Sequence, residues 1–282
     1  CAENETSGVA YFSDGSCEEI DLSGYLEWRG TTADYLGSDK KSRKSGIIGI
    51  WVNSPKLSVT DLASICLDKL DEGNVLIIEL DGFGYYNLME HTPDFIGGYE
   101  AYPMRTVMPA ISNVALSAII TGEMPEVNGI IERGQREVNA ADMFEIASGS
   151  GFECAVVEGR TALVTMSVEQ TLNPDINNSG DTDNEVQEAA LEKIAEGYQF
   201  IFVHFHGFDD VAHTYGPSSG KAAEKVRELD DYVKILCDNF EGTVIITADH
   251  GQRLTNDEDK PGGHGEFMPI DLTVPFIIFK VN

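Results

Sequence analysis

Acidic and histidine side chains follow three hydrophobic runs of the chain, and these residue types bind metal ions. Asp81 comes directly after residues 75–80, and Asp249 with His250 comes just after residues 243–247. The remaining members of the pattern are Asp209, His213 and His264. Carboxylate oxygens and imidazole nitrogens together are typical ligands of zinc and similar divalent ions. The side chains make two mixed sets, so the sequence predicts two metals of the kind that assist phosphoryl transfer.

Each cluster also has a purely structural interpretation. An aspartate followed by a glycine, as at Asp81, is typical of a turn or a helix cap. His213 lies four residues after Asp209, which is the spacing of an ion pair along a helix. Each cluster alone is explained by a local structural role. Three such clusters in one chain, followed by His264 between glycines, are explained more simply by a single site, so their joint occurrence favours metal binding.

A hydroxyl nucleophile for such a site lies in residues 109–122, where the sequence predicts a helix beginning at Ser112. The first turn of a helix has free backbone N–H groups and the positive end of the helix dipole, which favour an alkoxide and a bound phosphate. Ser112 is therefore the candidate nucleophile. The alternative is that its hydroxyl only caps the helix, since serine is a preferred N-cap residue.

The hydrophobic runs that precede these residues are typical of a buried parallel sheet, because they are short and nearly continuous in hydrophobicity. The predicted strands are residues 75–80, 154–157, 200–205, 243–247 and 275–279. Stretches with helical periodicity lie between them, at residues 185–196 and 221–239. This alternation predicts an α/β fold whose strands present the candidate residues at their carboxyl ends.

The first 70 residues follow the alternation less clearly. We expect a strand over residues 46–52, a helix over 61–70 and a basic, polar loop over 38–45. No repeat or low-complexity linker interrupts the chain. We therefore predict an accessory N-terminal edge or flap over residues 1–45 and a single domain over residues 46–282.

The sequence starts at Cys1, followed by polar residues, which suits an extracytoplasmic lipoprotein anchored through that cysteine. It suits an arbitrary boundary in a cytoplasmic protein equally well. The five cysteines include no Cys-x-x-Cys pair, so they indicate neither a zinc knuckle nor a redox motif.

Composition disfavours several classes of protein. With 282 residues, 42% of them hydrophobic, the chain is long enough to bury a full core. The longest apolar runs are about six residues, whereas a membrane helix needs roughly 18 to 20. The net charge of −29 opposes binding to nucleic acid, but bound metal ions would make a cleft locally positive and suited to a small phosphorylated substrate. Nothing in the sequence predicts the oligomeric state.

The motifs occur in one order along roughly residues 75–280. They are Asp81, then Ser112 ahead of Thr121-Gly122, Pro125-Glu126 and Gly129-Ile130, then Asp209 and His213 ahead of Tyr215-Gly216-Pro217, then Asp249-His250-Gly251, and finally His264-Gly265. This order resembles the alkaline phosphatase superfamily and, within it, the type I phosphodiesterase / nucleotide pyrophosphatase branch. The resemblance implies a three-layer α/β/α sandwich with a mostly parallel central sheet, without a large cap insertion.

Position by position, the resemblance implies two metal sites. One metal would lie on Asp81, Asp249 and His250 together with the hydroxyl of Ser112. The other would lie on Asp209, His213 and His264. The ions would be zinc, with manganese as the alternative, and Ser112 would attack phosphorus to form a phospho-enzyme.

The resemblance also implies substrate contacts, and here the chain departs from the branch. We expect Asn113 and Arg133 to bind substrate. Arg133 stands where the phosphodiesterases have an asparagine, and its guanidinium suits a dianionic phosphate or a carboxylate. A serine nucleophile is likewise typical of the phosphomonoesterase and mutase branches. The structural alternative for Arg133 is an ion pair with Glu132 or Glu137 at the rim of the site.

We therefore predict a two-metal phosphoryl-transfer hydrolase acting on small phosphodiesters or nucleotide-type substrates. The alternative is a phosphomonoesterase or a phosphonoacetate-type hydrolase, in which Arg133 binds the extra charge. A mutase and a sulfatase are disfavoured, because the large inserted domain of the first and the Cys/Ser-x-Pro-x-Arg motif of the second are missing. A non-catalytic relative is disfavoured because every core position is present. His204 and His206, on one face of a predicted strand, are expected to support the site or face the substrate.

Overall fold

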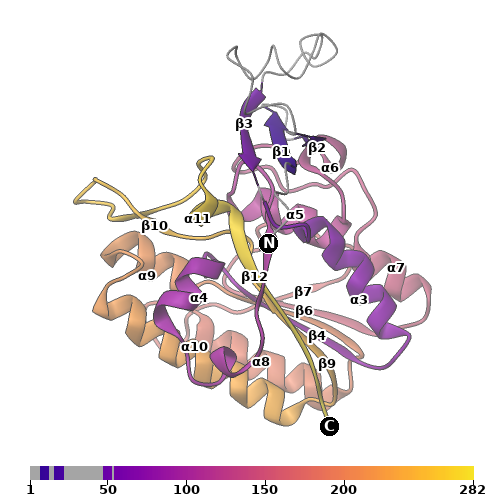
Figure 1. Cartoon of the computed structure of the whole chain (residues 1–282). Helices are drawn as coiled ribbons and strands as arrows, with labels where there is room; N and C mark the ends of the chain where they lie inside the picture. The colour runs from indigo at the N-terminus through magenta and orange to yellow at the C-terminus, as the bar shows by residue number, and fades with distance from the viewer. Residues whose placement is uncertain (1–6, 13–15, 22–46, 53) are drawn as a thin grey trace, which may run out of the picture.

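The computed structural model describes residues 7–12, 16–21, 47–52 and 54–282, and a seven-stranded sheet forms its centre (Figure 1). In order across the sheet, the strands are β5 (Tyr102–Arg105), β12 (Thr273–Val281), β9 (Gly242–Thr247), β4 (Val75–Leu80), β8 (Phe200–Phe205), β6 (Cys154–Glu158) and β7 (Gln170–Leu172). The strands β9, β4, β8, β6 and β7 pair in parallel, whereas β12 runs antiparallel to both β9 and β5. The sheet is therefore mostly parallel, as predicted.

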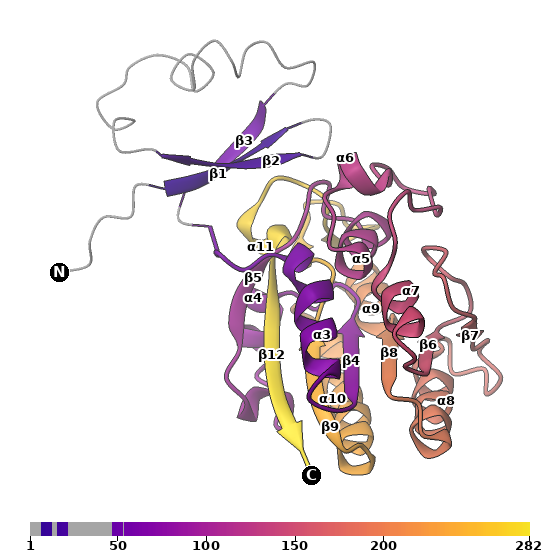
Figure 2. The ribbon, with the colours of Figure 1, turned by 90° about the vertical axis from the view of Figure 1, so that its right-hand side faces the viewer.

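Helices cover both faces of the sheet. One face carries α3 (Leu62–Leu70) with its preceding 3-10 turn η2 (Val59–Asp61), α5 (Ser112–Thr121) and α7 (Met143–Gly149). The other face carries α4 (Tyr85–His91), α8 (Asp183–Glu196), α9 (Gly207–Tyr215) and α10 (Gly220–Asn239). Both faces are visible in Figures 1 and 2. The three-layer α/β/α prediction is confirmed.

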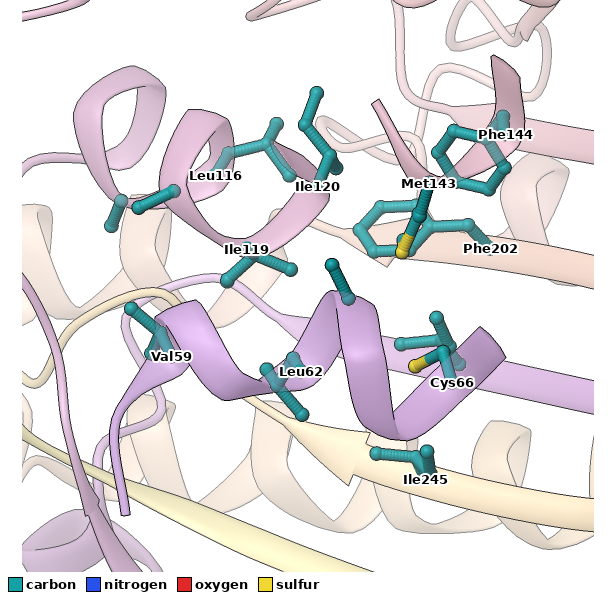
Figure 3. Packing of buried hydrophobic residues seen from close by; sticks show 14 of the residues in the cluster. Val59, Leu62, Cys66, Leu116, Ile119, Ile120, Met143, Phe144, Phe202 and Ile245 are labelled. Atoms are coloured by element: carbon teal, nitrogen blue, oxygen red, sulfur yellow. The ribbon is translucent and has the colours of Figure 1, made fainter. Parts of the chain in front are cut away.

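Alternate residues of the central strands enter two separate cores. In β4, Val75 and Ile77 pack beneath α3, α5 and α7, while Leu76 and Ile78 face α8 and α10. This alternation follows from the pleat of a strand, and it explains why strands buried on both faces are hydrophobic at almost every position. Figure 3 shows the first core, where α3 and α5 pack together over Phe202 of β8 and Ile245 of β9.

The remaining elements of the central body are short. They are η3 (Ile96–Gly98), α6 (Pro125–Asn128), β10 (Arg253–Leu254), β11 (Gly262–Gly263) and α11 (Pro269–Leu272). Among the described residues, no helix combines the length and the apolar character needed to cross a bilayer.

A second, antiparallel sheet stands at the end of the molecule that carries α5 and α11 (Figure 2). It comprises β1 (Ser7–Phe12), β2 (Cys17–Asp21) and β3 (Ile47–Val52), with β1 in the middle. Val9 and Tyr11 of β1 pack against Met108, Ala110 and Leu272 of the central body. The ring of Tyr11 also meets Phe267 edge to face, with ring centroids 5.2 Å apart.

The predicted strands of the central sheet are all present, with ends within two residues of those expected. The strands β5 and β7 were not predicted: β5 begins with exposed residues and contains a proline, and β7 has three residues. The predicted strand over residues 46–52 is also present as β3, but it pairs with β1, so the small sheet extends past residue 45. The division at that residue stays a prediction. Cys1 and the loop expected over residues 38–45 lie outside the described residues.

Candidate active site

The carboxyl ends of three neighbouring parallel strands bring the acidic residues together. Asp81 directly follows β4, Asp249 comes two residues after β9, and Asp209 lies in the first turn of α9, just after β8. Because these strands are adjacent and parallel, the loops that follow them meet at one edge of the sheet. The exposure of Asp81 is 4%, and Asp249 is fully buried, so the carboxylates gather in a poorly hydrated place.

Ser112 faces this edge from the first residue of α5. Its Oγ donates a hydrogen bond to Asp81 Oδ1 at 3.4 Å and lies 3.3 Å from His250 Nε2. Ile111, with an extended backbone, is the N-cap of this helix, and no side chain in the described part of the structure makes a capping hydrogen bond there. The alternative that Ser112 only caps the helix is therefore wrong. The first backbone N–H groups of α5 lie beside the hydroxyl, as expected at a helix start.

Asp249 has one satisfied and one unsatisfied carboxylate oxygen. Its Oδ1 accepts hydrogen bonds from the backbone N–H of Gly82 at 3.0 Å and from that of His250 at 2.8 Å. Its Oδ2 is buried and has no hydrogen-bond partner among the described residues, and it lies 3.3 Å from His250 Nε2. A buried anionic oxygen without a donor is unfavourable, and a cation at this position would satisfy it.

Two histidines are oriented around Asp209. His213 Nε2 lies 3.2 Å from Asp209 Oδ2, and His264 Nε2 lies 3.9 Å from Asp209 Oδ1. The Nδ1 atoms of the two rings face backbone carbonyls, that of Gly262 at 3.0 Å and that of Ala110 at 2.8 Å. A carbonyl can only accept, so each Nδ1 carries the proton and each Nε2 is left for a metal, which is the usual arrangement of a metal-ligating histidine.

His250 lies between the two sets. Ligand atoms of Asp81, Asp249 and His250 lie within 4.8 Å of one another, and so do those of Asp209, His250 and His264. The resemblance places His250 in the first set alone, whereas its ring stacks on His264 with centroids 3.7 Å apart and thereby also approaches the second set. His213 contacts this second set through Asp209. The structure thus brings all the predicted ligands and Ser112 into one cluster.

The charges of the cluster fit divalent cations. Burial, together with the charges of Asp249 and Asp209, raises the pKa of Asp81 to about 6. Burial and the neighbouring charge of His250 lower the pKa of His264 to about 4, so this imidazole is neutral at pH 7. The carboxylates repel one another, the imidazole of His264 is neutral, and one oxygen of Asp249 is unsatisfied. Together these groups form a donor set of mixed O and N atoms, which suits zinc or manganese.

A second layer of charged side chains holds Asp81 from behind. His206 Nδ1 lies 3.2 Å from Asp81 Oδ2, and His206 Nε2 lies 3.2 Å from Glu158 Oε2. The same Glu158 oxygen lies 3.0 Å from His204 Nδ1, and His204 is fully buried. Both histidines therefore contact residues that support Asp81, and His206 also faces the neighbouring pocket, so it occupies both positions expected of the pair.

Sequence reasoning singled out neither Glu158 nor Gln252. Glu158 is the last residue of β6 and is fully buried, and an acidic residue at the end of a hydrophobic strand is the signal that would have found it. Gln252 is also fully buried, and its Nε2 donates to Asp209 Oδ1. A glutamine is not among the residue types that usually bind zinc, so the sequence contains no comparable signal for it.

The two residues expected to bind substrate occupy different environments. Asn113 is buried, and its Nδ2 donates to the carbonyls of Glu132 and Gln135, both at 2.9 Å, which holds the loop around Arg133 onto α5. The side chain of Arg133 is exposed. Within residues 54–282 it forms no ion pair with Glu132 or with Glu137, so the structural alternative does not occur there. Their roles in substrate binding stay predictions.

A pocket of about 240 Å³ opens beside the cluster. Asp81 and His206 form part of its wall, and Arg160, Asp181 and Asp210 also line it. A larger cavity of about 640 Å³ lies between α4 and α10, and it contains none of the predicted site residues. The smaller pocket is therefore the one that adjoins the chemistry.

Solved structures with this fold include enzymes that act on phosphorus compounds. A phosphonoacetate hydrolase from Sinorhizobium meliloti, in complex with phosphonoformate, is 18% identical with a TM-score of 0.56, over 67% of this chain and 59% of that one. A murine ectonucleotide pyrophosphatase / phosphodiesterase, in complex with AMP, is 15% identical with a TM-score of 0.54, over 66% of this chain and 59% of that one. At these identities the likeness shows the fold.

Sequence comparison gives the family. A GPI ethanolamine phosphate transferase from Eremothecium gossypii is 32% identical over 71 residues, which is 24% of this chain and 6% of that protein. The chain thus matches only a small part of this curated relative. Residues 75–271 match the family described as type I phosphodiesterase / nucleotide pyrophosphatase, a stretch that includes Asp81, Ser112 and every predicted metal ligand. The chain therefore belongs to the type I phosphodiesterase / nucleotide pyrophosphatase family.

Proposed function

We propose that the chain is a two-metal phosphoryl-transfer hydrolase that acts on small phosphodiesters or nucleotide-type substrates through Ser112. The observation that carries the proposal is the position of Ser112 Oγ, 3.4 Å from Asp81 Oδ1 and 3.3 Å from His250 Nε2 at the start of α5. Membership of the family supports the class of reaction.

Two groups of side chains would hold the metals. Asp81, Asp249 and His250 would bind one divalent ion beside the hydroxyl of Ser112. Asp209, His213 and His264 would bind the other. When bound, the ions would lower the pKa of the nucleophile and offset negative charge on the phosphoryl oxygens.

The side chains themselves supply the nucleophile and its orientation. Ser112 Oγ loses its proton to solvent and attacks phosphorus in line, while the bond from phosphorus to one ester oxygen breaks and that oxygen takes up a proton from water. A serine phosphodiester forms that keeps the other organic group of the substrate, and water then cleaves its bond to Ser112 and releases the phosphomonoester. The backbone N–H groups at the start of α5 donate toward the phosphoryl oxygens, and the helix dipole favours their charge. His206, held by Glu158, fixes Asp81 Oδ2 and leaves Asp81 Oδ1 toward the serine.

The group attached to phosphorus would lie in the pocket of about 240 Å³ beside Asp81. Its lining is largely polar, with Arg160 and the carboxylates of Asp181 and Asp210. Asp181 pairs with Lys225 at 2.6 Å, so part of the acidic charge is already neutralised. A small, polar group suits this pocket better than a large apolar one.

A phosphomonoester or phosphonate is the second candidate substrate, and the environment of Arg133 favours it. The guanidinium is exposed on a loop that Asn113 anchors to the first turn of α5. If this loop brings the guanidinium to a bound substrate, it would bind the additional charge of a dianionic phosphate or of a substrate carboxylate.

Paired substrates test both candidates. Metal-free protein reconstituted with Zn²⁺ or Mn²⁺ is assayed on bis(p-nitrophenyl) phosphate, on p-nitrophenyl phosphate and on phosphonoacetate. We expect Ser112→Ala to lower kcat by about 10³-fold or more, since the nucleophile is lost. Ser117→Ala, on the same helix but bonded to the Val114 carbonyl, is the matched control and should keep its activity.

The substrate preference then separates the candidates. A preference for the diester supports the phosphodiesterase, and Arg133→Gln should leave it unchanged. A preference for the monoester or phosphonate that falls in Arg133→Gln supports the second candidate. Activity that persists in Ser112→Ala contradicts the role of the serine, and absence of activity on every substrate with either metal contradicts both candidates.

A further inference from the structure

Gln252 lies against two of the residues that surround the second metal position. Its Nε2 donates to Asp209 Oδ1, and the same atom lies 3.3 Å from His213 Nε2. Since His213 Nδ1 donates a hydrogen bond to the Gly262 carbonyl, its Nε2 is the atom available for a metal. The end of the Gln252 side chain thus lies where a ligand atom of Asp209 and one of His213 converge.

The amide oxygen of Gln252 forms no hydrogen bond within the described part of the protein. Gln252 is fully buried, and its Oε1 is buried with no hydrogen-bond partner among the described residues. Burying a carbonyl oxygen without a donor is unfavourable, and such atoms in folded proteins call for a bound ion or water. In the structure the amide nitrogen faces Asp209 and His213, so the unsatisfied oxygen would reach a ligand shared with them once the amide turns over.

The backbone around Gln252 fixes the direction of the side chain. Asn87 clamps the residue on both sides: its Oδ1 accepts from the Gln252 N–H at 3.1 Å, and its Nδ2 donates to the Gln252 carbonyl at 3.0 Å. A Cβ at Gly82 would lie 2.8 Å from Asp209 Oδ1 and 3.1 Å from Gln252 Cγ, so glycine is needed for the two side chains to sit together. These contacts hold the amide next to the ligands.

We propose that Gln252 is a further ligand of the second metal, binding it through Oε1 beside Asp209, His213 and His264. The inference rests on the proposed two-metal function. Without an ion, the amide donates its N–H to Asp209. With an ion, the amide group rotates by a half-turn about the Cγ–Cδ bond. This rotation exchanges the positions of Nε2 and Oε1, which have similar shapes, and turns the oxygen toward the ion.

An amide oxygen changes the preference of the site among metals. With Gln252, half of the protein donors of the second site are oxygens, and oxygen donors favour Mn²⁺ and Mg²⁺ relative to softer ions. Removal of the amide oxygen should therefore weaken Mn²⁺ binding more than Zn²⁺ binding.

Metal affinity measured without substrate tests the inference. Mn²⁺ and Zn²⁺ are titrated separately into chelator-treated full-length chain against a competing indicator. We expect the wild type to bind two ions and Gln252→Met to bind the second about 10-fold or more weakly, as substitutions around metal ligands commonly do. Gln187→Met replaces another buried glutamine, on α8, and should bind both ions as the wild type does.

Gln252→Glu distinguishes a ligand from a hydrogen-bond donor. A glutamate keeps the oxygen but has no N–H, and it places a second negative charge beside Asp209. A ligand role predicts that Gln252→Glu binds the second ion at least as tightly as the wild type. A role in orienting Asp209 predicts weaker binding, and that result overturns the inference.

The remaining outcomes are also decisive. Wild-type binding of two ions that Gln252→Met leaves unchanged overturns this inference and leaves the proposed function intact. A wild-type chain that binds neither ion overturns both. Thermal unfolding of the metal-free variants shows which are folded, and if Gln252→Met does not fold, Gln252→Glu alone decides.

Discussion

Asp81 uses its two oxygens on opposite sides of the site. Oδ1 accepts from Ser112, and Oδ2 faces His206 at 3.2 Å and His204 at 3.7 Å. Glu158 contacts both histidines, so the orientation of Asp81 is set by residues that lie behind the reaction centre. Under the proposed function, this arrangement would orient the carboxylate before a metal or substrate binds, which is the main requirement of a preorganised site.

The pair formed by His204 and Glu158 predicts how the stability of the metal-free chain depends on pH. Burial, and then His206, act to lower the pKa of His204, but Glu158 and Glu79 outweigh them and raise it to about 9. A raised histidine pKa means that the folded state binds more protons between about pH 6.5 and 9. The contribution of His204, on the order of 3 kcal/mol at most, is therefore full below pH 6.5 and lost as the pH rises through 9.

Urea unfolding in the presence of a chelator, from pH 6 to pH 10, measures this dependence. We expect Glu158→Gln to be less stable than the wild type near pH 6 and to show a flatter decline above it, because the neutral amide no longer raises the histidine pKa. Glu188→Gln, on the exposed side of α8, is the control and should follow the wild type. Parallel pH profiles for the wild type and Glu158→Gln would contradict the assignment.

Two loops at the edge of the sheet approach each other so closely that only glycine fits. A Cβ added to Gly84 or to Gly251 would overlap backbone atoms, those of Gly251 and Ile270 respectively. Gly251 lies between His250, a proposed metal ligand, and the clamped Gln252, and its N–H donates to the Asp271 carbonyl at 3.0 Å. The close packing of these loops thus fixes the backbone on both sides of Gly251, and with it the positions of His250 and Gln252.

Gly251→Ala should therefore reduce both stability and metal binding. Overpacking of this kind typically costs about 1–3 kcal/mol, and the shift of the loop should weaken the binding of both ions because His250 approaches both sets. Gly149→Ala, at a position where an added Cβ meets nothing within 4 Å, is the matched control. Denaturant unfolding and metal titration measure the two effects, and a Gly251→Ala variant equal to the control in both would disprove the argument.

The elements show which parts of the structure the sequence can predict. The strands β4 and β8 are hydrophobic at nearly every position because both faces are buried, so the sequence predicts their positions directly. The places of Asp81 and Asp209 follow from the ends of these strands. The strand β5 contains Pro103 and begins exposed, so it forms only because β12 offers it an edge. The contact of Gln252 with Asp209 and that of Glu158 with His204 join residues more than 40 positions apart in the sequence. No local sequence pattern encodes such contacts.

At the scale of the whole molecule, the small sheet is attached to the body beside the site. Tyr11 packs on Met108 and Phe267, and the neighbouring Ala110 carbonyl orients His264. The Tyr11 ring is almost fully buried, and its hydroxyl has no hydrogen-bond partner among the described residues. The ring therefore contributes to the attachment by packing, and its hydroxyl does not.

Two substitutions separate these contributions. Tyr11→Phe should leave stability unchanged or raise it by about 1–3 kcal/mol, because a buried and unsatisfied hydroxyl is removed. Tyr11→Ala should lower it by about 3–5 kcal/mol, as expected for the loss of a buried aromatic ring. Thermal unfolding of both variants measures the effect. A large loss of stability in Tyr11→Phe would contradict this argument, because it would mean that the hydroxyl makes a stabilising hydrogen bond.

The antiparallel strand β12 follows β9 and β5 in the sequence, yet it lies between them in the sheet. During synthesis, β5 therefore emerges long before the strand that joins the two, and β9 emerges shortly before it. Until residues 273–281 leave the ribosome, the nascent chain presents an open edge of β9 next to hydrophobic surface that its own next strand must cover. The order of translation thus leaves one edge of the sheet open to pairing with other chains until β12 has joined it.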